Sequence, residues 1–91
     1  MPASSDVVVA ATLPAAVALH ARPAARFVQL AASYPCSLTV AANGRRANAK
    51  SILDVLALGA TGGTELELAA SGDGAAEAVE ELAALVAGLV E

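Results

Sequence analysis

The segment from Leu19 to Ala25 holds the residues of this chain that are best suited to do chemistry. It places the single histidine, His20, two residues before Arg22 and three before Pro23, and an apolar run follows. Because proline lacks an amide hydrogen, it is tolerated only in the first turn of a helix, so His20 is predicted at or just before a helix N-terminus. Free backbone amides and the positive end of the helix dipole bind anions there. A nucleophilic imidazole, a guanidinium and free amides together favour a phosphoryl group as the ligand.

The rest of the sequence predicts seven elements that would position this segment. They are, in chain order, a strand over 6–13, a helix over 21–32, strands over 36–42 and 46–49, a short helix between Ser51 and Gly59, a strand over 64–70 and a C-terminal helix. The strand predictions rest on β-branched content and period-two alternation, and the helix predictions on apolar residues three and four positions apart. Strands with one apolar face and helices with one apolar stripe predict two layers, a sheet covered on one side by helices.

Three local patterns predict the ends of these elements. Asn43-Gly44 is typical of a tight hairpin turn, and the turn over 71–74 offers a cap for the last helix. Ser51, followed three positions later by Asp54, predicts a helix N-cap. The positions expected to face the core are Ala24, Phe27, Val28 and Ala31 in the first helix, Leu38, Val40, Ala42, Leu66, Leu68 and Ala70 in the strands, and Ala76, Val79, Leu82, Ala83, Val86, Leu89 and Val90 in the last helix.

The composition predicts one small domain over 1–91. Of the 91 residues 57% are hydrophobic, but 25 are alanine, which indicates helix packing with small side chains and no insertion into a membrane. The range Val7–Leu19 could pass for a signal-peptide core, but Asp6 precedes it, no Lys or Arg does, and Pro14 interrupts it. The lone Cys36 excludes an internal disulfide, so we expect a reducing, cytoplasmic location.

The charges are distributed unevenly along the chain. The net charge is −4, yet all five basic residues lie between positions 22 and 50, and residues 51–91 carry eight acids and no base. This balance argues against nonspecific nucleic-acid binding. A basic face around His20 would suit an acidic partner or a phosphoryl donor, but scattered solvated arginines explain the charges equally well. The sequence also holds no metal-ligand cluster, no second catalytic base and no glycine-rich nucleotide loop, which argues against an independent enzyme and against a cofactor.

Two motifs carry a resemblance to a known family. Leu19-His20-Ala21-Arg22-Pro23-Ala24 resembles the active-site signature of HPr, the small phosphocarrier of the phosphoenolpyruvate-dependent sugar phosphotransferase system. The run from Lys50 to Ala60 resembles the second signature of that family, around its regulatory serine, and the 31 positions from His20 to Ser51 match the family spacing. The resemblance covers residues 6 to 90. It implies an α/β (α+β) fold, the HPr-like open-faced β-sandwich, with a four-stranded antiparallel sheet covered on one side by three helices.

The resemblance also implies a function. His20 would accept a phosphoryl group on Nδ1 from enzyme I, ultimately from phosphoenolpyruvate, and pass it to IIA domains of sugar permeases. The protein would then be a carrier and a covalent intermediate rather than an enzyme. Arg22 would bind the phosphoryl oxygens through its guanidinium, the amides of Ala21 and Arg22 would donate to them, and Pro23 would fix the first helical turn while biasing Arg22 away from helical dihedrals. Without the resemblance, a lone histidine at a helix start is more often a capping or structural residue.

Ser51 has two compatible interpretations, an N-cap and, by the resemblance, a site of regulatory phosphorylation by an HPr kinase/phosphorylase. The resemblance further implies a docking surface, and its residues are Ala25, Arg26, Gln29, Ile52, Leu53 and Leu56. Transient docking favours a monomer. Core packing would account for some of the apolar members of this set.

The chain departs from the family pattern at two places. Ala18 stands where family members usually carry glycine, preceded by Val17 in place of a small polar residue, and Asp54 stands where many have Gly or Lys. A methyl group at position 18 could restrict the loop before His20, and an acid at position 54 could alter partner choice. Two alternatives to sugar uptake stay open, a regulatory interaction module controlled through Ser51 and a carrier of the nitrogen-regulatory branch. The intact pair of His20 and Arg22 argues against the first.

Overall fold

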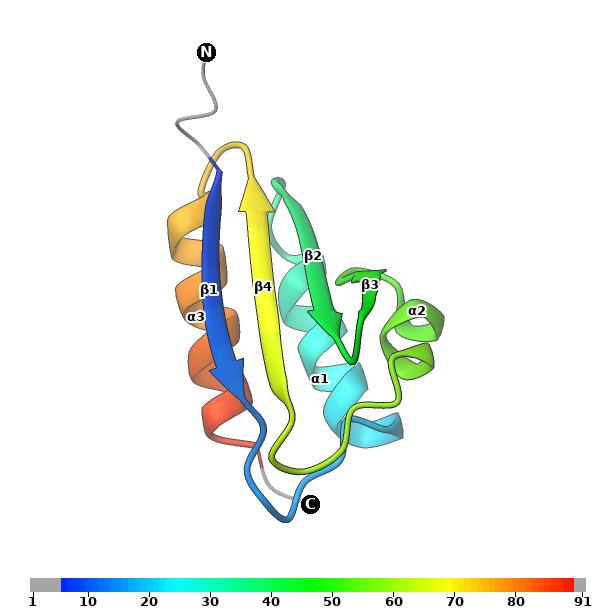
Figure 1. Cartoon of the computed structure of the whole chain (residues 1–91). Coiled ribbons are helices and arrows are strands. Elements are labelled where there is room, and N and C mark those ends of the chain that lie inside the picture. The colour runs from blue at the N-terminus through cyan, green and yellow to red at the C-terminus, as the bar shows by residue number, and fades with distance from the viewer. Residues whose placement is uncertain (1–5, 90–91) are drawn as a thin grey trace.

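A computed structural model describes residues 6–89, which form four strands and three helices. Their order is β1 (Val7–Thr12), α1 (Ala21–Ala32), β2 (Ser37–Ala42), β3 (Arg45–Asn48), α2 (Ile52–Ala57), β4 (Glu65–Ser71) and α3 (Ala75–Ala87). The strands form one antiparallel sheet in the order β1-β4-β2-β3. Helices α1 and α3 lie together on one face of the sheet, and α2 lies beside β3 (Figure 1). The predicted fold, an open-faced sandwich with helices on one side, is confirmed.

The core lies between the sheet and the helices. The inward positions expected in β2 and β4 are all buried, and Phe27 of α1 is the largest fully buried side chain. Period-two alternation therefore gave the correct face of both central strands. The hairpin between β2 and β3 is also confirmed, because Asn43 and Gly44 both adopt positive φ, 55° and 77°, as the tight turn requires.

Two expectations for α3 are wrong. No side chain of the turn over 71–74 caps the helix, whose N-cap is Gly74 in the left-handed conformation. Ala76 is exposed, whereas Ala75 and Ala78 are buried together with Val79. Alanine occurs on every side of this helix, so it does not report which side faces the core. Val90, also expected in the core, lies outside the described residues.

The ends of the elements differ from the predictions by about one residue. Strand β1 is shorter at both ends than 6–13, β2 begins at Ser37, and β3 and β4 are displaced by one position from 46–49 and 64–70. Among residues 6–89, no helix is long and apolar enough to cross a membrane.

Candidate functional site

His20 is the N-cap residue of α1. Its backbone is extended, with φ −116° and ψ −163°, and the helix begins at the next residue. Pro23 is buried in the first turn, while His20 and Arg22 are exposed. The predicted place of His20 at a helix N-terminus is therefore confirmed. Arg22 is the second residue of α1, so the departure from helical backbone that Pro23 led us to expect there is not seen.

The backbone at this helix end includes two amides that the helix itself does not use. The Ala24 N–H donates to the His20 carbonyl oxygen at 2.8 Å, and Pro23 has no N–H. The amides of Ala21 and Arg22 come before Ala24, the first intrahelical donor, and like the first amides of any helix they have no intrahelical acceptor. The His20 side chain does not cap α1, which removes the capping role as an explanation for this histidine. A shallow hollow of about 380 Å³ is lined by His20, Ala21, Arg22 and Pro23.

The segment before His20 is fastened to the loop between α2 and β4. The Leu19 N–H donates to the Ala60 carbonyl oxygen at 2.9 Å. Leu13 makes two bonds to the same loop, donating to the Thr64 carbonyl oxygen and accepting from the Gly63 N–H, each at 3.0 Å. The side chains of Leu13, Val17 and Leu19 are buried. These contacts were not predicted, and the only signal in the sequence is the spacing of three apolar residues within an irregular segment.

The backbone at position 18 accommodates Ala18, which stands where family members usually carry glycine. Among the described residues, Asn43 is the only non-glycine with positive φ, so Ala18 lies outside the left-handed region that favours glycine. Its methyl group is half-buried, and the neighbouring Val17 is buried. An alanine at this position therefore requires no strained backbone.

Ser51 caps α2. Its Oγ accepts a hydrogen bond from the Asp54 N–H at 3.3 Å, as the pattern of Ser51 and Asp54 predicted. The preceding residue is also fixed, because the Lys50 ammonium donates to the Tyr34 carbonyl oxygen at 2.6 Å. The structure thus places Ser51 at a well-defined helix start, with its side chain half-buried.

The expected docking residues lie on two helices, α1 and α2, which pack against each other. Leu53 is 75% exposed, Ile52 is 37% exposed and Leu56 is half-buried. On α1, Arg26 and Gln29 are exposed and Ala25 is half-buried. An apolar side chain as exposed as Leu53 is not explained by core packing.

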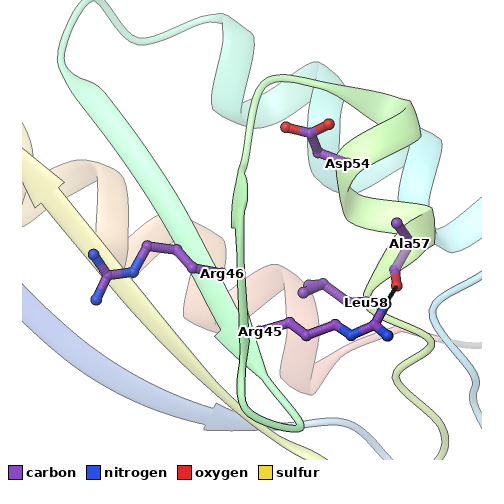
Figure 2. A pocket seen from close by; sticks show the side chains of 5 residues that line it. All are labelled: Arg45, Arg46, Asp54, Ala57 and Leu58. Atoms are coloured by element: carbon purple, nitrogen blue, oxygen red, sulfur yellow. Dashed lines mark hydrogen bonds between the residues drawn. The ribbon is translucent and has the colours of Figure 1, made fainter.

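A second hollow, of about 440 Å³, lies between β3 and α2 and is lined by Arg45, Arg46, Asp54, Ala57 and Leu58. Figure 2 shows that the Arg45 side chain reaches across to α2, where it donates to the Ala57 carbonyl oxygen at 3.2 Å. The Arg46 side chain points away from the other four (Figure 2). Arg45 therefore stabilises the C-terminal end of α2, and the two arginines do not converge on a ligand.

Metal chemistry has no candidate site within residues 6–89, where no three His, Cys, Asp or Glu side chains could hold an ion. Cys36, a free cysteine, is buried directly before β2. The hollow at His20 is thus the place in the described structure where a nucleophile, a guanidinium and helix amides meet.

Comparison with known proteins shows the family to which the chain belongs. Residues 8–88 match the family model described as "PTS HPr component phosphorylation site". The chain is 51% identical over 70 residues to the phosphocarrier protein HPr of Streptomyces coelicolor, with 76% of this chain and 75% of that protein covered. It is 46% identical over 68 residues to the HPr of Vibrio cholerae, covering 75% of this chain and 80% of that protein.

A solved structure of similar fold is that of the phosphocarrier protein HPr from Bacillus anthracis. It superposes with a TM-score of 0.86 at 34% identity, and the match covers 91% of this chain and 99% of that one. The family model spans most of the chain, and the sequence relatives and the fold agree with it. The chain belongs to the HPr family, the phosphocarriers of the phosphotransferase system.

Proposed function

We propose that His20 is the residue that carries the phosphoryl group. The observation that carries this proposal is its position as an exposed N-cap of α1, in one hollow with Arg22 and the amides of Ala21 and Arg22. A neutral imidazole nitrogen attacks the phosphorus, the new N–P bond forms as the bond to the donor breaks, and the donor keeps its electron pair. The guanidinium and the two amides stabilise the charge on the phosphoryl oxygens during transfer.

In this proposal the donor is enzyme I, charged by phosphoenolpyruvate, and the acceptors are IIA domains of sugar permeases. The phosphohistidine keeps a high transfer potential, so the chain relays the group between two enzymes and completes no turnover of its own. Both partners dock on the exposed side chains of α1 and α2, around Leu53 and Arg26. The whole chain acts as one domain in the cytoplasm, where the thiol of Cys36 stays reduced.

Intact-mass measurement tests the proposal directly. The protein is incubated with phosphoenolpyruvate and a bacterial enzyme I, in parallel with the variant His20→Ala. We expect a gain of one phosphoryl group that is acid-labile and absent from the variant. If the folded protein gains nothing, even with the enzyme I of its own organism, His20 is not the acceptor.

A regulatory module is the second candidate, favoured by one observation. The chain is 44% identical over 68 residues to the HPr-like protein Crh of Bacillus subtilis. In such a module Ser51 is phosphorylated by an HPr kinase/phosphorylase, and the added charge changes the docking surface beside Leu53. Incubation with ATP and the kinase would then give an acid-stable phosphate that is absent from Ser51→Ala. The two functions are compatible, because the two phosphates occupy different residues.

A further inference from the structure

We propose that Gly62 is a positioning residue for phosphoryl transfer. Its missing side chain lets the turn over 14–17 pack directly on the loop over 60–64, and this contact sets the place of His20. The inference rests on the proposed role of His20 as the phosphoryl acceptor.

The contact at Gly62 leaves no room for a side chain. A Cβ atom there would collide with the Ala15 carbonyl oxygen and lie 2.7 Å from the carbonyl carbon of that residue and 3.1 Å from the Pro14 carbonyl oxygen. All three are backbone atoms, so no side-chain rotation relieves the collision. Gly62 is also not among the glycines with positive φ, so its backbone conformation does not itself require glycine. What the position requires is the close approach of two backbones.

The turn over 14–17 is the side of this contact that would move. The loop over 60–64 is held by two internal hydrogen bonds. The Thr64 N–H donates to the Thr61 carbonyl oxygen at 3.0 Å, and Thr64 Oγ1 accepts from the Thr61 N–H at 3.2 Å. The turn has one internal bond, from the Val17 N–H to the Pro14 carbonyl oxygen at 3.0 Å. A side chain at position 62 would therefore push the turn outward.

This displacement would reach His20 through the backbone. The segment is fastened on both sides of the turn, at Leu13 by the bonds to Gly63 and Thr64 and at Leu19 by the bond to Ala60. Since His20 follows Leu19 directly, a shift that loosens the Leu19 bond also moves the imidazole relative to Arg22. Phosphoryl transfer depends on in-line placement, so a small shift lowers the rate.

The test compares Gly62→Ala with Gly88→Ala. Gly88, at the end of α3, has φ −98°, and its added Cβ would meet only ordinary contacts, at 3.5 and 3.9 Å. Enzyme I phosphorylates each protein over a range of carrier concentrations. We expect kcat to fall between about tenfold and a hundredfold for Gly62→Ala, with KM within about twofold, because the docking side chains on α1 and α2 are untouched. Gly88→Ala should match the wild type. An unchanged kcat, or a rise in KM alone, overturns the proposal.

Hydrogen exchange of the wild-type protein keeps the proposal testable if Gly62→Ala does not fold. The amides of Leu13, Leu19 and Gly63 should exchange slowly, because they donate the three bonds that fasten the segment. Exchange at the rates of an unstructured peptide would overturn the proposal. In a folded Gly62→Ala variant, these amides should lose protection while those of β2 and β4 keep theirs. This measurement needs no partner, so it separates failure of the Gly62 proposal from failure of His20 as the acceptor.

Discussion

Arg22 is the residue on which the charge balance of the site depends. As the second residue of α1, it brings a positive charge to the positive end of the helix dipole, which is an unfavourable place for an arginine. Its side chain is exposed, so packing does not account for it. An anion held between the guanidinium and the helix amides would offset this cost, which is the arrangement that a phosphoryl site needs.

Substitution of Arg22 is therefore expected to slow transfer without unfolding the protein. We expect Arg22→Ala to lower the rate of phosphorylation by about 10² to 10³, the usual cost of removing one preorganised donor from a charged transition state. The rate for Arg22→Lys should fall between those of the wild type and Arg22→Ala, because an ammonium keeps the charge and loses the bidentate geometry. Rapid-quench measurement with enzyme I gives the rates. Arg46→Ala is the matched control, since Arg46 is an exposed arginine on β3 that does not line the hollow at His20. Wild-type rates for Arg22→Ala would remove Arg22 from the site.

Ser51 has a structural role that is separate from any phosphorylation. Its Oγ accepts from the Asp54 N–H, so Ser51→Ala leaves that amide without its cap and should lower the free energy of unfolding by about 1 kcal/mol. Ser51→Asp retains an acceptor at the N-cap and should be nearly neutral. Urea unfolding followed by circular dichroism measures both. Equal stability of Ser51→Ala and the wild type would show that this hydrogen bond does not contribute.

At the scale of elements, α2 combines a buried face and an exposed apolar side chain in six residues. A helix this short is not stable alone, and neighbouring side chains hold its last turn through the Ala57 and Leu58 carbonyl oxygens, which accept from Arg45 and Asn43. Val55 is fully buried, and Leu53 is 75% exposed. The helix is thus held by its ends and by one inward side chain, which leaves Leu53 available to a partner.

Substitutions on the two faces of α2 should separate folding from docking. Val55→Ala removes buried methyl groups and should cost about 2 kcal/mol of unfolding free energy. Leu53→Ala should change that free energy by less than about 0.5 kcal/mol and raise KM for enzyme I several-fold. Urea unfolding and steady-state phosphorylation provide the two measurements. If Leu53→Ala leaves KM unchanged, the docking surface lies elsewhere.

Features that depend on a few neighbouring residues were predicted correctly, whereas features that depend on distant contacts were not. The faces of β2 and β4, the turn at Asn43-Gly44 and the cap at Ser51 each depend on a few neighbouring residues, and each was predicted correctly. The rotation of α3 about its own axis was predicted incorrectly. Ala75, Ala76 and Ala78 have the same side chain, so only contact with the sheet decides which of them is buried. Its N-cap, Gly74, makes no side-chain hydrogen bond that a sequence pattern could reveal.

At the scale of the whole molecule, contacts between residues far apart in the chain are the part of the structure that local sequence patterns do not predict. The central position of β4, between β1 and β2, follows from strand pairings that no local pattern specifies. The same holds for the site. One motif singles out His20 and Arg22 as candidates, but the attachment of Leu13 and Leu19 to the loop over 60–64 joins segments that are far apart in the chain. The sequence therefore indicates which residues could do the chemistry, whereas the contacts that position them are visible only in the fold.

In the folded protein, acidic side chains of the C-terminal half raise the pKa of a tyrosine in the N-terminal half. Tyr34, between α1 and β2, has its pKa raised above 10.0, first by desolvation at its half-buried position and then by the negative charges of Glu81 and Glu77 on α3 and of Cys36. The acidic C-terminal half of the sequence thus acts on a residue of the N-terminal half. Folding favours the neutral phenol, because ionisation would place a third negative charge beside the two glutamates.

This coupling predicts a loss of stability at alkaline pH. Between the ordinary pKa of tyrosine and the raised one, the unfolded chain has released its proton and the folded chain retains it, so the free energy of unfolding falls as pH rises. The contribution is complete below about pH 10 and is lost as pH rises through the raised pKa. Urea unfolding from about pH 8 to 11 should therefore show a steeper decline for the wild type than for Tyr34→Phe. Every other ionisable group is present in both chains, so the difference isolates the phenol. Glu81→Gln should make the decline shallower, and parallel pH profiles for all three proteins would contradict the coupling.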